Sequence, residues 1–220
     1  MFCSKDLLTS YNSGFTMDKF EKEVLVVPRA KLFLGDEFSG FKALNGTEYL
    51  PRIKEYFQFM KRGLAEKDPS FKQIIPYAVI VNKKDGTAYF YRRGSGAGYS
   101  ETRLYSKGSI GVGGHLEKED CVGKDPIEAG MLREISEEIT IAGTFKAIPF
   151  GFINMENTEV SQVHFGIVYI IETDATEVRF NNGEIAEGGM IAPSKMSTEN
   201  VEEWTEMLIE PVKEYLSSTD

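Results

Sequence analysis

The sequence predicts an α/β fold in which a mixed sheet is sandwiched by helices. Runs rich in β-branched and aromatic residues recur between positions 72 and 180, and amphipathic helical stretches fall at 125–139 and 198–216. With 220 residues and 41% hydrophobic content, the chain can bury one large core or two modest ones. We expect a main domain over 72–220, with an accessory N-terminal segment, residues 1–71, packed on it.

The accessory segment is expected to contain one strand and one helix. Residues 23–27 (EVLVV) form an apolar run that predicts a short strand ended by Pro28. Apolar residues then recur at helical spacing over 49–64. This spacing predicts an amphipathic helix with Pro51 in its first turn and with its aromatic side chains in the core.

The main domain is expected to open with a β-hairpin. Its two strands are QIIPYAVIVN and GTAYFYRR, joined by KKDG, whose Asp85-Gly86 pair suits positive φ. Further strands are predicted at 145–153, 163–172 and 176–180. The closing helix over 198–216 would hold in its first turn the acidic residues Glu199, Glu202 and Glu203. No internal repeat is evident.

Composition narrows the class of protein. The net charge of −9 argues against a binder of duplex nucleic acid, which needs a basic surface to displace counterions from phosphates. No run approaches the roughly 20 apolar residues of a membrane span, and the N-terminus lacks the order of a signal peptide, so we expect no membrane partner and a cytoplasmic location. Cys3 and Cys121 fit no metal or redox spacing and are interpreted as free thiols.

The helix over 125–139 gathers carboxylates on one side. Asp125 and Glu128 form a capping-box pattern around Pro126. The face expected to be buried consists of Met131, Leu132, Ile135 and Ile139. At about 100° per residue, one arc beside that face holds Glu134, Glu137 and Glu138. Arg133 flanks the arc and can pair with Glu137.

This arc differs from an ordinary solvated face. A solvated face intersperses charges of both signs, whereas here three negative side chains meet one positive one. Glu134 and Glu138, at spacing i,i+4, repel each other unless a cation lies between them. Their oxygen ligands suit a hard divalent ion, and we expect Mg²⁺ or Mn²⁺.

The stretch REISEEITI, preceded by GVGGHLE, resembles the signature of the Nudix hydrolases. The matching positions are Arg133, Glu134, Ile135, Glu137, Glu138 and Ile141. The resemblance covers about residues 74–205 and implies a Nudix-like fold. The chain departs from the signature in a five-residue insertion within EKEDCVGK, in Asp125 where the family has Glu, and in Thr140 where it has Gly.

The resemblance implies a divalent-metal-dependent hydrolase that cleaves a pyrophosphate bond in a nucleoside diphosphate linked to another group. Glu134 and Glu138 are then direct metal ligands, and Glu137 is either a third ligand or the group that orients them. The Gly114 carbonyl is a further candidate ligand, since a glycine lets the chain approach a metal closely. Arg133 would orient a carboxylate.

Further candidate site residues lie outside the matched positions of the signature. For the catalytic base we favour Glu184 and Glu187 in NNGEIAEGG over Glu156 and Glu159 in MENTEV. Arg92 and Arg93, at a strand end, could clamp a phosphate or simply be exposed. Three further assignments stay open: metal contacts from Glu117 or Asp125, and a position for His115 at the site. His164 is interpreted as structural.

Two alternatives remain beside a hydrolase of a small phosphorylated, nucleotide-like substrate. One is a catalytically silent domain that binds a nucleotide-like ligand or a protein, since fold alone does not fix function. The other is a prenyl diphosphate isomerase, which would need a cysteine with a glutamate, and neither cysteine has a convincing strand position. A homodimer is expected from family habit and from the aromatic content of the accessory segment.

Overall fold

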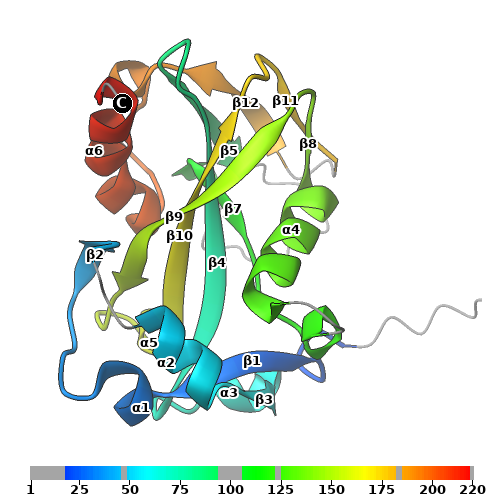
Figure 1. The fold of residues 1–220 in the computed structure, drawn as a ribbon, viewed down its shortest axis with the longest axis vertical. Coiled ribbons are helices and arrows are strands. Elements are labelled where there is room, and N and C mark those ends of the chain that lie inside the picture. The colour runs from blue at the N-terminus through cyan, green and yellow to red at the C-terminus, as the bar shows by residue number, and fades with distance from the viewer. Residues whose placement is uncertain (1–17, 46–48, 94–105, 122–124, 182–184, 219–220) are drawn as a thin grey trace, which may run out of the picture.

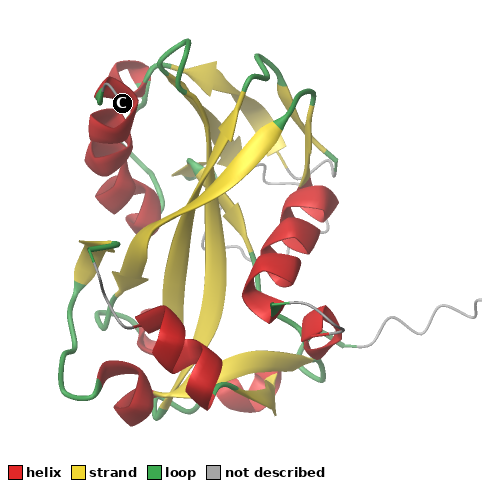
Figure 2. Cartoon of the chain, viewed as in Figure 1, coloured by secondary structure: helices red, strands yellow, loops and turns green. Residues whose placement is uncertain are grey.

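The computed structural model describes residues 18–45, 49–93, 106–121, 125–181 and 185–218. Figure 1 shows the elements, and Figure 2 separates helices from strands. The α-helices are α1 (Arg29–Phe33), α2 (Tyr49–Tyr56), α3 (Arg62–Ala65), α4 (Pro126–Glu138), α5 (Glu159–Gln162) and α6 (Glu203–Ser217). Two short 3₁₀ helices are η2 (Lys118–Cys121) and η3 (Pro193–Lys195). None of the helices within these ranges is long and apolar enough to cross a membrane.

The strands form one mixed sheet and one small ribbon. The mixed sheet holds β1 (Glu23–Pro28), β2 (Gly40–Ala43), β3 (Gln58–Lys61), β4 (Phe71–Asn82), β5 (Thr87–Arg93), β6 (Gly108–Ser109), β7 (Gly111–Gly113), β9 (Phe145–Asn154), β10 (His164–Thr173) and β12 (Ile185–Ile191). The ribbon pairs β8 (Ile139–Ile141) with β11 (Val178–Phe180). The main path through the sheet runs β12-β5-β4-β10-β9-β2.

Strand β4 is the centre of the sheet. It pairs in parallel with β10 from Gln73 to Val81, and antiparallel with β1, β5 and β7. Its side chains alternate between two cores, as the period of two in a strand requires. Ile74, Ala78 and Ile80 face the core that contains α4, and Val79 and Val81 face the core that contains α6. Figure 1 shows these two helices on opposite sides of the sheet, so the predicted α/β sandwich is confirmed.

The accessory segment contributes to the same sheet and the same core. β1 pairs with the first residues of β4, and β2 extends the other edge beside β9. Tyr49 of α2 is 1% exposed and packs against Phe152 and Phe165 of the main domain, with ring centroids 5.2 and 5.6 Å apart. The accessory segment therefore lies against the main domain through shared strands and through aromatic packing.

The predicted helix over 49–64 is wrong after Tyr56. Residues Gln58–Lys61 form β3 instead, because they pair antiparallel with β1, where Val24 faces Met60. Only the short α3 follows, and Leu64, expected on a buried face, is 62% exposed. The apolar spacing of these residues favours a helix, but their pairing with the distant strand β1 stabilises a strand instead.

The C-terminal region also begins its helix later than predicted. α6 starts at Glu203, because Asn200 has a positive φ of 53° and Val201 forms a bridge with Gly108. Glu202 is the N-cap residue, and Glu203 and Glu206 occupy the first turn, so Glu199 lies outside the helix. The predicted hairpin is confirmed by β4 and β5, with Gly86 at φ 64° in the turn.

Candidate active site

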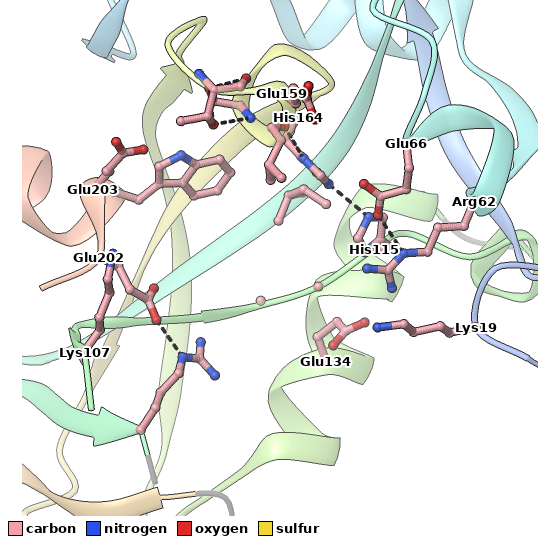
Figure 3. Close-up of a pocket in the computed structure, with 18 of the residues that line it drawn as sticks. Lys19, Arg62, Glu66, Lys107, His115, Glu134, Glu159, His164, Glu202 and Glu203 are labelled. Atoms are coloured by element: carbon pink, nitrogen blue, oxygen red, sulfur yellow. Dashed lines mark hydrogen bonds and ion pairs between the residues drawn. The ribbon is translucent and has the colours of Figure 1, made fainter. Parts of the chain in front are cut away.

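A pocket of about 820 Å³ opens beside the N-terminal end of β10, between α4, the chain that follows β7, α3 and the start of α6. Figure 3 shows how side chains from these elements point into it. Its basic side chains are Lys19, Arg62, Arg93 and Lys107. Its carboxylates are Glu66, Glu117, Glu134, Glu138, Glu159, Glu202 and Glu203. The pocket therefore holds both carboxylates, which could bind a metal ion, and cations, which could attract a phosphate.

Helix α4 presents its carboxylates through the local signals seen in the sequence. The Asp125 side chain caps the helix by accepting a hydrogen bond of 3.0 Å from the Ile127 amide, and Pro126 follows in the first turn. Met131 and Ile135 are buried as expected. Leu132 was expected on the same face but is 39% exposed, because it lies at the border of the buried stripe. Asp125 caps α4 and pairs with Lys54 of α2, and it does not line this pocket.

Glu134 lies directly against the main chain at Gly114. Its side chain is 13% exposed and lines the pocket. A Cβ at position 114 would stand 2.5 Å from the Glu134 carboxylate, so only glycine allows this approach. Burial raises the pKa of Glu134 above its usual 4.5, while the neighbouring Arg133 lowers it. A buried carboxylate on the wall of a pocket is the group that a bound cation would stabilise.

The other two glutamates of the arc differ in position. Glu138, one turn after Glu134, also lines the pocket. Glu137 does not line the pocket: its side chain is 58% exposed, and it accepts a hydrogen bond of 3.2 Å from Arg133. The predicted pair between Arg133 and Glu137 is thus confirmed. Among the described residues, the three carboxylates do not converge on one point within 4.8 Å.

Arg133 is held by a residue that the sequence analysis missed. Its guanidinium donates to both oxygens of Asp120, Nε to Oδ1 at 2.8 Å and Nη2 to Oδ2 at 3.0 Å. It also reaches Glu134 at 2.8 Å and the His115 carbonyl at 3.0 Å. The Asp120 bond, followed by the neighbouring carboxylates, raises the pKa of Arg133 above its usual value. Asp120 belongs to the insertion that interrupts the family signature, which is why the signature gave no sign of it.

The substrate-binding residues predicted at the end of β5 separate in the structure. Arg93 lines the pocket, where its Nε donates to Glu202 at 2.6 Å. Arg92 points elsewhere, with Nη1 donating to the Ser106 carbonyl at 3.3 Å, and it does not line the pocket. Glu117 lines the pocket and pairs with Lys22 of the accessory segment at 2.6 Å.

The predicted catalytic bases are only partly placed. Glu184 lies outside the described residues. Glu187 belongs to β12, a strand that the sequence analysis did not predict. It is exposed, faces Arg92 in the strand register and does not line the pocket. Of the two alternatives, Glu159 lines the pocket, whereas Glu156 is bound to Lys72 at 2.7 Å and to Arg29 at 2.7 Å.

Both histidines line the pocket. The Nε2 atoms of His115 and His164 are 3.2 Å apart, and Nδ1 of His164 is 2.7 Å from the Val160 carbonyl. Burial lowers the pKa of His115 well below its usual 6.5, and the nearby charge of Arg62 lowers it further. Cys121, which an isomerase would need at its site, does not line the pocket.

Several pocket residues carried no signal in the sequence. Lys19, Arg62 and Glu66 come from the accessory segment, and Trp204 comes from the first turn of α6. Trp204 packs edge-on against Tyr77, with ring centroids 5.3 Å apart, and leaves part of its indole exposed. These residues are far from the signature in the chain, so only the fold brings them to it.

Comparisons with known proteins bear on the fold that carries this pocket. No protein-family model matches the chain. Protein YmaB of Bacillus subtilis (strain 168) is 29% identical over 207 residues, which cover 88% of this chain and 98% of YmaB. The crystal structure of Tm1382, which is described there as a candidate Nudix hydrolase, superposes with a TM-score of 0.72 at 26% identity, covering 88% of this chain and 100% of Tm1382.

A third comparison covers a smaller part of the chain. The Nudix domain of Shewanella oneidensis NrtR superposes with a TM-score of 0.50 at 13% identity, covering 66% of this chain and 89% of that domain. The match to Tm1382 covers more of this chain than residues 72–220 could supply, so it includes part of the accessory segment. The chain therefore has the Nudix fold, and the resemblance seen in its sequence is confirmed at the level of the fold.

Proposed function

We propose that the protein is a divalent-metal-dependent hydrolase that cleaves the pyrophosphate bond of a nucleoside diphosphate linked to another group. The observation that supports this most is the contact between Glu134 and Gly114 in the pocket. A buried carboxylate is placed where only a glycine main chain leaves room for it, with Glu138 beside it on the same wall.

These residues fit a hard divalent ion. Glu134 and Glu138 would supply carboxylate oxygens, and Gly114 a main-chain carbonyl, which is the donor set that Mg²⁺ or Mn²⁺ prefers. When bound, the ion supplies charge neutralisation at the phosphoryl oxygens and lowers the pKa of a bound water. Glu137 is either a third ligand or, through Arg133, part of the group that orients Glu134.

Charges around the pocket suit an anionic substrate. Lys19, Arg62, Arg93 and Lys107 line the pocket together with the metal-binding carboxylates. These four cations offset part of the charge of the seven carboxylates in the pocket, and a bound divalent ion would offset more of it where phosphates would enter. Arg93, fixed by Glu202 at 2.6 Å, is the better candidate for a phosphate clamp than Arg92, which lies outside the pocket.

A nucleoside is supported by the aromatic part of the pocket. Trp204 can stack on a base, since every base has a π-face that an indole can cover. The NrtR domain, which shares the fold, was crystallised with ADP ribose, so this fold can hold a nucleoside diphosphate linked to a sugar.

The catalytic base can be identified by replacing each candidate glutamate in turn and measuring the activity of each variant. We retain Glu184 and Glu187 as predictions and include Glu159, the one of the two alternatives that lines the pocket. Glu159→Gln, Glu184→Gln and Glu187→Gln would each be assayed over pH. The base is the residue whose replacement lowers kcat and removes the acidic limb of the pH–rate profile, because that limb reports protonation of the base.

The function itself is tested with a panel of nucleoside diphosphate derivatives in the presence of Mg²⁺. Hydrolysis products are identified by mass spectrometry for the wild type and for Glu134→Gln and Glu138→Gln. Glu128→Gln is the matched control, since Glu128 is an exposed glutamate of the same helix outside the pocket. We expect hydrolysis that Glu128→Gln retains and that the other two variants lose by roughly 100-fold or more.

Two results would contradict the proposal. Hydrolysis that survives in both Glu134→Gln and Glu138→Gln would remove the carboxylates from the mechanism. Binding of nucleotides without any cleavage across the panel would favour the silent binding domain instead. The homodimer expected from the sequence stays a prediction, which light scattering of the purified protein would measure.

A further inference from the structure

A second group of metal-ligating side chains lies in the pocket, apart from the carboxylates of α4. It consists of Glu66, which follows α3, His115, which follows β7, and His164, the first residue of β10. One ligand atom from each lies within 4.8 Å of the other two. Figure 3 shows the three side chains pointing toward one another from different elements, with Glu134 on the far side of His115.

The distance between the imidazoles matches shared coordination of one ion. The two Nε2 atoms are 3.2 Å apart. Two nitrogens bound tetrahedrally at 2.0–2.1 Å from one Zn²⁺ are about 3.3 Å apart. The same distance also allows a hydrogen bond between the rings, so the two explanations are separated by experiment below.

The surroundings hold both His164 and Glu66 in position. Nδ1 of His164 is 2.7 Å from the Val160 carbonyl, so in the neutral ring Nδ1–H donates there and the Nε2 lone pair faces His115. This is the outer contact that typically fixes the tautomer of a metal-ligating histidine. Arg62 orients Glu66 through a bond of 3.1 Å from Nε to Oε1.

We propose that Glu66, His115 and His164 form a binding site for one divalent transition-metal ion of the Zn²⁺ class. Two imidazoles and a carboxylate suit Zn²⁺, whereas Mg²⁺ prefers oxygen ligands, so this site differs in selectivity from the carboxylate site of α4. Three protein ligands leave a fourth coordination position, as in sites where a metal binds water or a substrate oxygen. All three ligands line the pocket, so that position is within reach of a phosphorylated ligand.

The site would also join the two parts of the chain. Glu66 comes from the accessory segment, and His115 and His164 come from the main domain. Binding of the ion would therefore stabilise the contact between α3 and the strands β7 and β10, because a ligand bound only by the folded state shifts the unfolding equilibrium. The accessory segment then supplies part of the site rather than only part of the core.

The test is a Zn²⁺ titration of tag-free, metal-depleted full-length protein, with excess Mg²⁺ present to occupy the carboxylate site. We expect one equivalent of Zn²⁺ to bind and to raise the melting temperature. Glu66→Gln, His115→Gln and His164→Gln should each weaken Zn²⁺ binding. Loss of a residue that only hydrogen-bonds to a metal ligand typically weakens binding by roughly 10- to 100-fold, and loss of a ligand itself should cost at least as much. Glu134→Gln is the matched control and should still bind Zn²⁺.

A second measurement does not depend on the variants folding. The chain contains two histidines, so its imidazole nitrogen spectrum has two sets of signals. One equivalent of Zn²⁺ should shift the Nε2 resonances of both rings in the wild type. Unchanged resonances, or Zn²⁺ binding that is lost in Glu134→Gln but kept in the histidine variants, would overturn the site.

These outcomes are independent of the proposed hydrolase. A protein that binds Zn²⁺ through its histidines but cleaves no pyrophosphate would contradict the hydrolase alone. A Mg²⁺-dependent hydrolase whose histidines ignore Zn²⁺ would contradict the Zn²⁺ site alone, and would leave the two rings as a hydrogen-bonded pair.

Discussion

Asp120 and Arg133 form a two-point ion pair behind the pocket wall that holds Glu134, with bonds of 2.8 and 3.0 Å to the two carboxylate oxygens. The Asp120 side chain is 4% exposed and that of Arg133 is 25% exposed, so this partly buried, two-point pair is stronger than a surface ion pair. Because Arg133 also donates to Glu134, the position of the buried carboxylate depends on a residue in the loop insertion.

Replacing Asp120 should therefore displace the Glu134 carboxylate, because Asp120 holds the Arg133 side chain that positions it. Asp120→Asn removes one charged acceptor, so we expect kcat to fall about 10- to 100-fold with little change in KM. The free energy of unfolding should fall by roughly 1–3 kcal/mol. Glu119→Gln, an exposed carboxylate in the same 3₁₀ helix, is the control and should change neither quantity. Additive effects of Asp120→Asn and Arg133→Lys in the double variant would refute the coupling.

Gly114 allows a test of position without loss of charge. In Gly114→Ala the new methyl would stand 2.5 Å from the Glu134 carboxylate, which can move because it is the end of a flexible side chain. We expect a small change in stability but a loss of roughly 100-fold in kcat, the size of effect expected when a catalytic group moves by about 1 Å. Gly189→Ala, where no atom lies within 4 Å of the new methyl, is the matched control. Wild-type activity in Gly114→Ala would disprove the role of this contact.

Trp204 allows the proposed nucleotide binding to be measured by fluorescence, because it is the single tryptophan of the chain. A base stacked on its indole should quench its fluorescence on titration with a nucleoside diphosphate. Trp204→Ala should weaken binding by about 1–3 kcal/mol, or roughly 5- to 150-fold, and Trp204→Phe should lose less. Unchanged affinity in Trp204→Ala would place the base elsewhere in the pocket.

Lys72 makes the stability of the protein sensitive to acid. Its side chain is 0% exposed, and its ammonium donates to Glu156 at 2.7 Å and to the Ser161 carbonyl at 3.1 Å. Burial of Glu156 opposes ionisation, but the hydrogen bonds from Lys72 and Arg29 lower its pKa below the usual 4.5. A carboxyl group with a lowered pKa in the folded state stabilises the protein above its unfolded pKa, and this stabilisation is lost as the pH falls through the folded value.

Urea unfolding at a series of pH values tests whether protonation of Glu156 destabilises the folded protein. Between about pH 5 and pH 3 the free energy of unfolding should fall less steeply in Glu156→Gln than in the wild type. At neutral pH, Glu156→Gln should lose roughly 1–3 kcal/mol, because it leaves the buried ammonium without its charged partner. Glu199→Gln, at an exposed position, is the control. Parallel pH profiles for wild type and Glu156→Gln would contradict this account.

The sequence predicted those parts of the fold whose signals are local. The cap at Asp125, the proline after it and the spacing of Met131 and Ile135 together define α4, and all of them act within one helix. The resemblance to the Nudix signature added the order of elements around that helix. The strands β9 and β10 were likewise visible as β-rich runs.

The errors have a common physical cause in contacts between distant residues. Gln58–Lys61 is a strand only because β1 lies beside it, and no local pattern reports that pairing. Asp120 and Glu66 reach the site from an insertion and from the accessory segment, which no signature describes. Strand β12, which holds Glu187, was also not predicted, because it forms by pairing with the distant β5.

The aromatic cluster around Tyr49 bears on how the chain could be divided. Tyr49 and Phe33 from the accessory segment interlock with Phe165, at ring-centroid distances of 5.6 and 5.9 Å. If a protease cut between the two parts, the fragments should stay associated non-covalently. If the gene were truncated at this boundary, the remaining protein would have a cavity in its hydrophobic core. A chimera that takes its N-terminal third from a relative should therefore fold only if the main-domain aromatic residues that contact this segment, such as Phe165, are exchanged together with it.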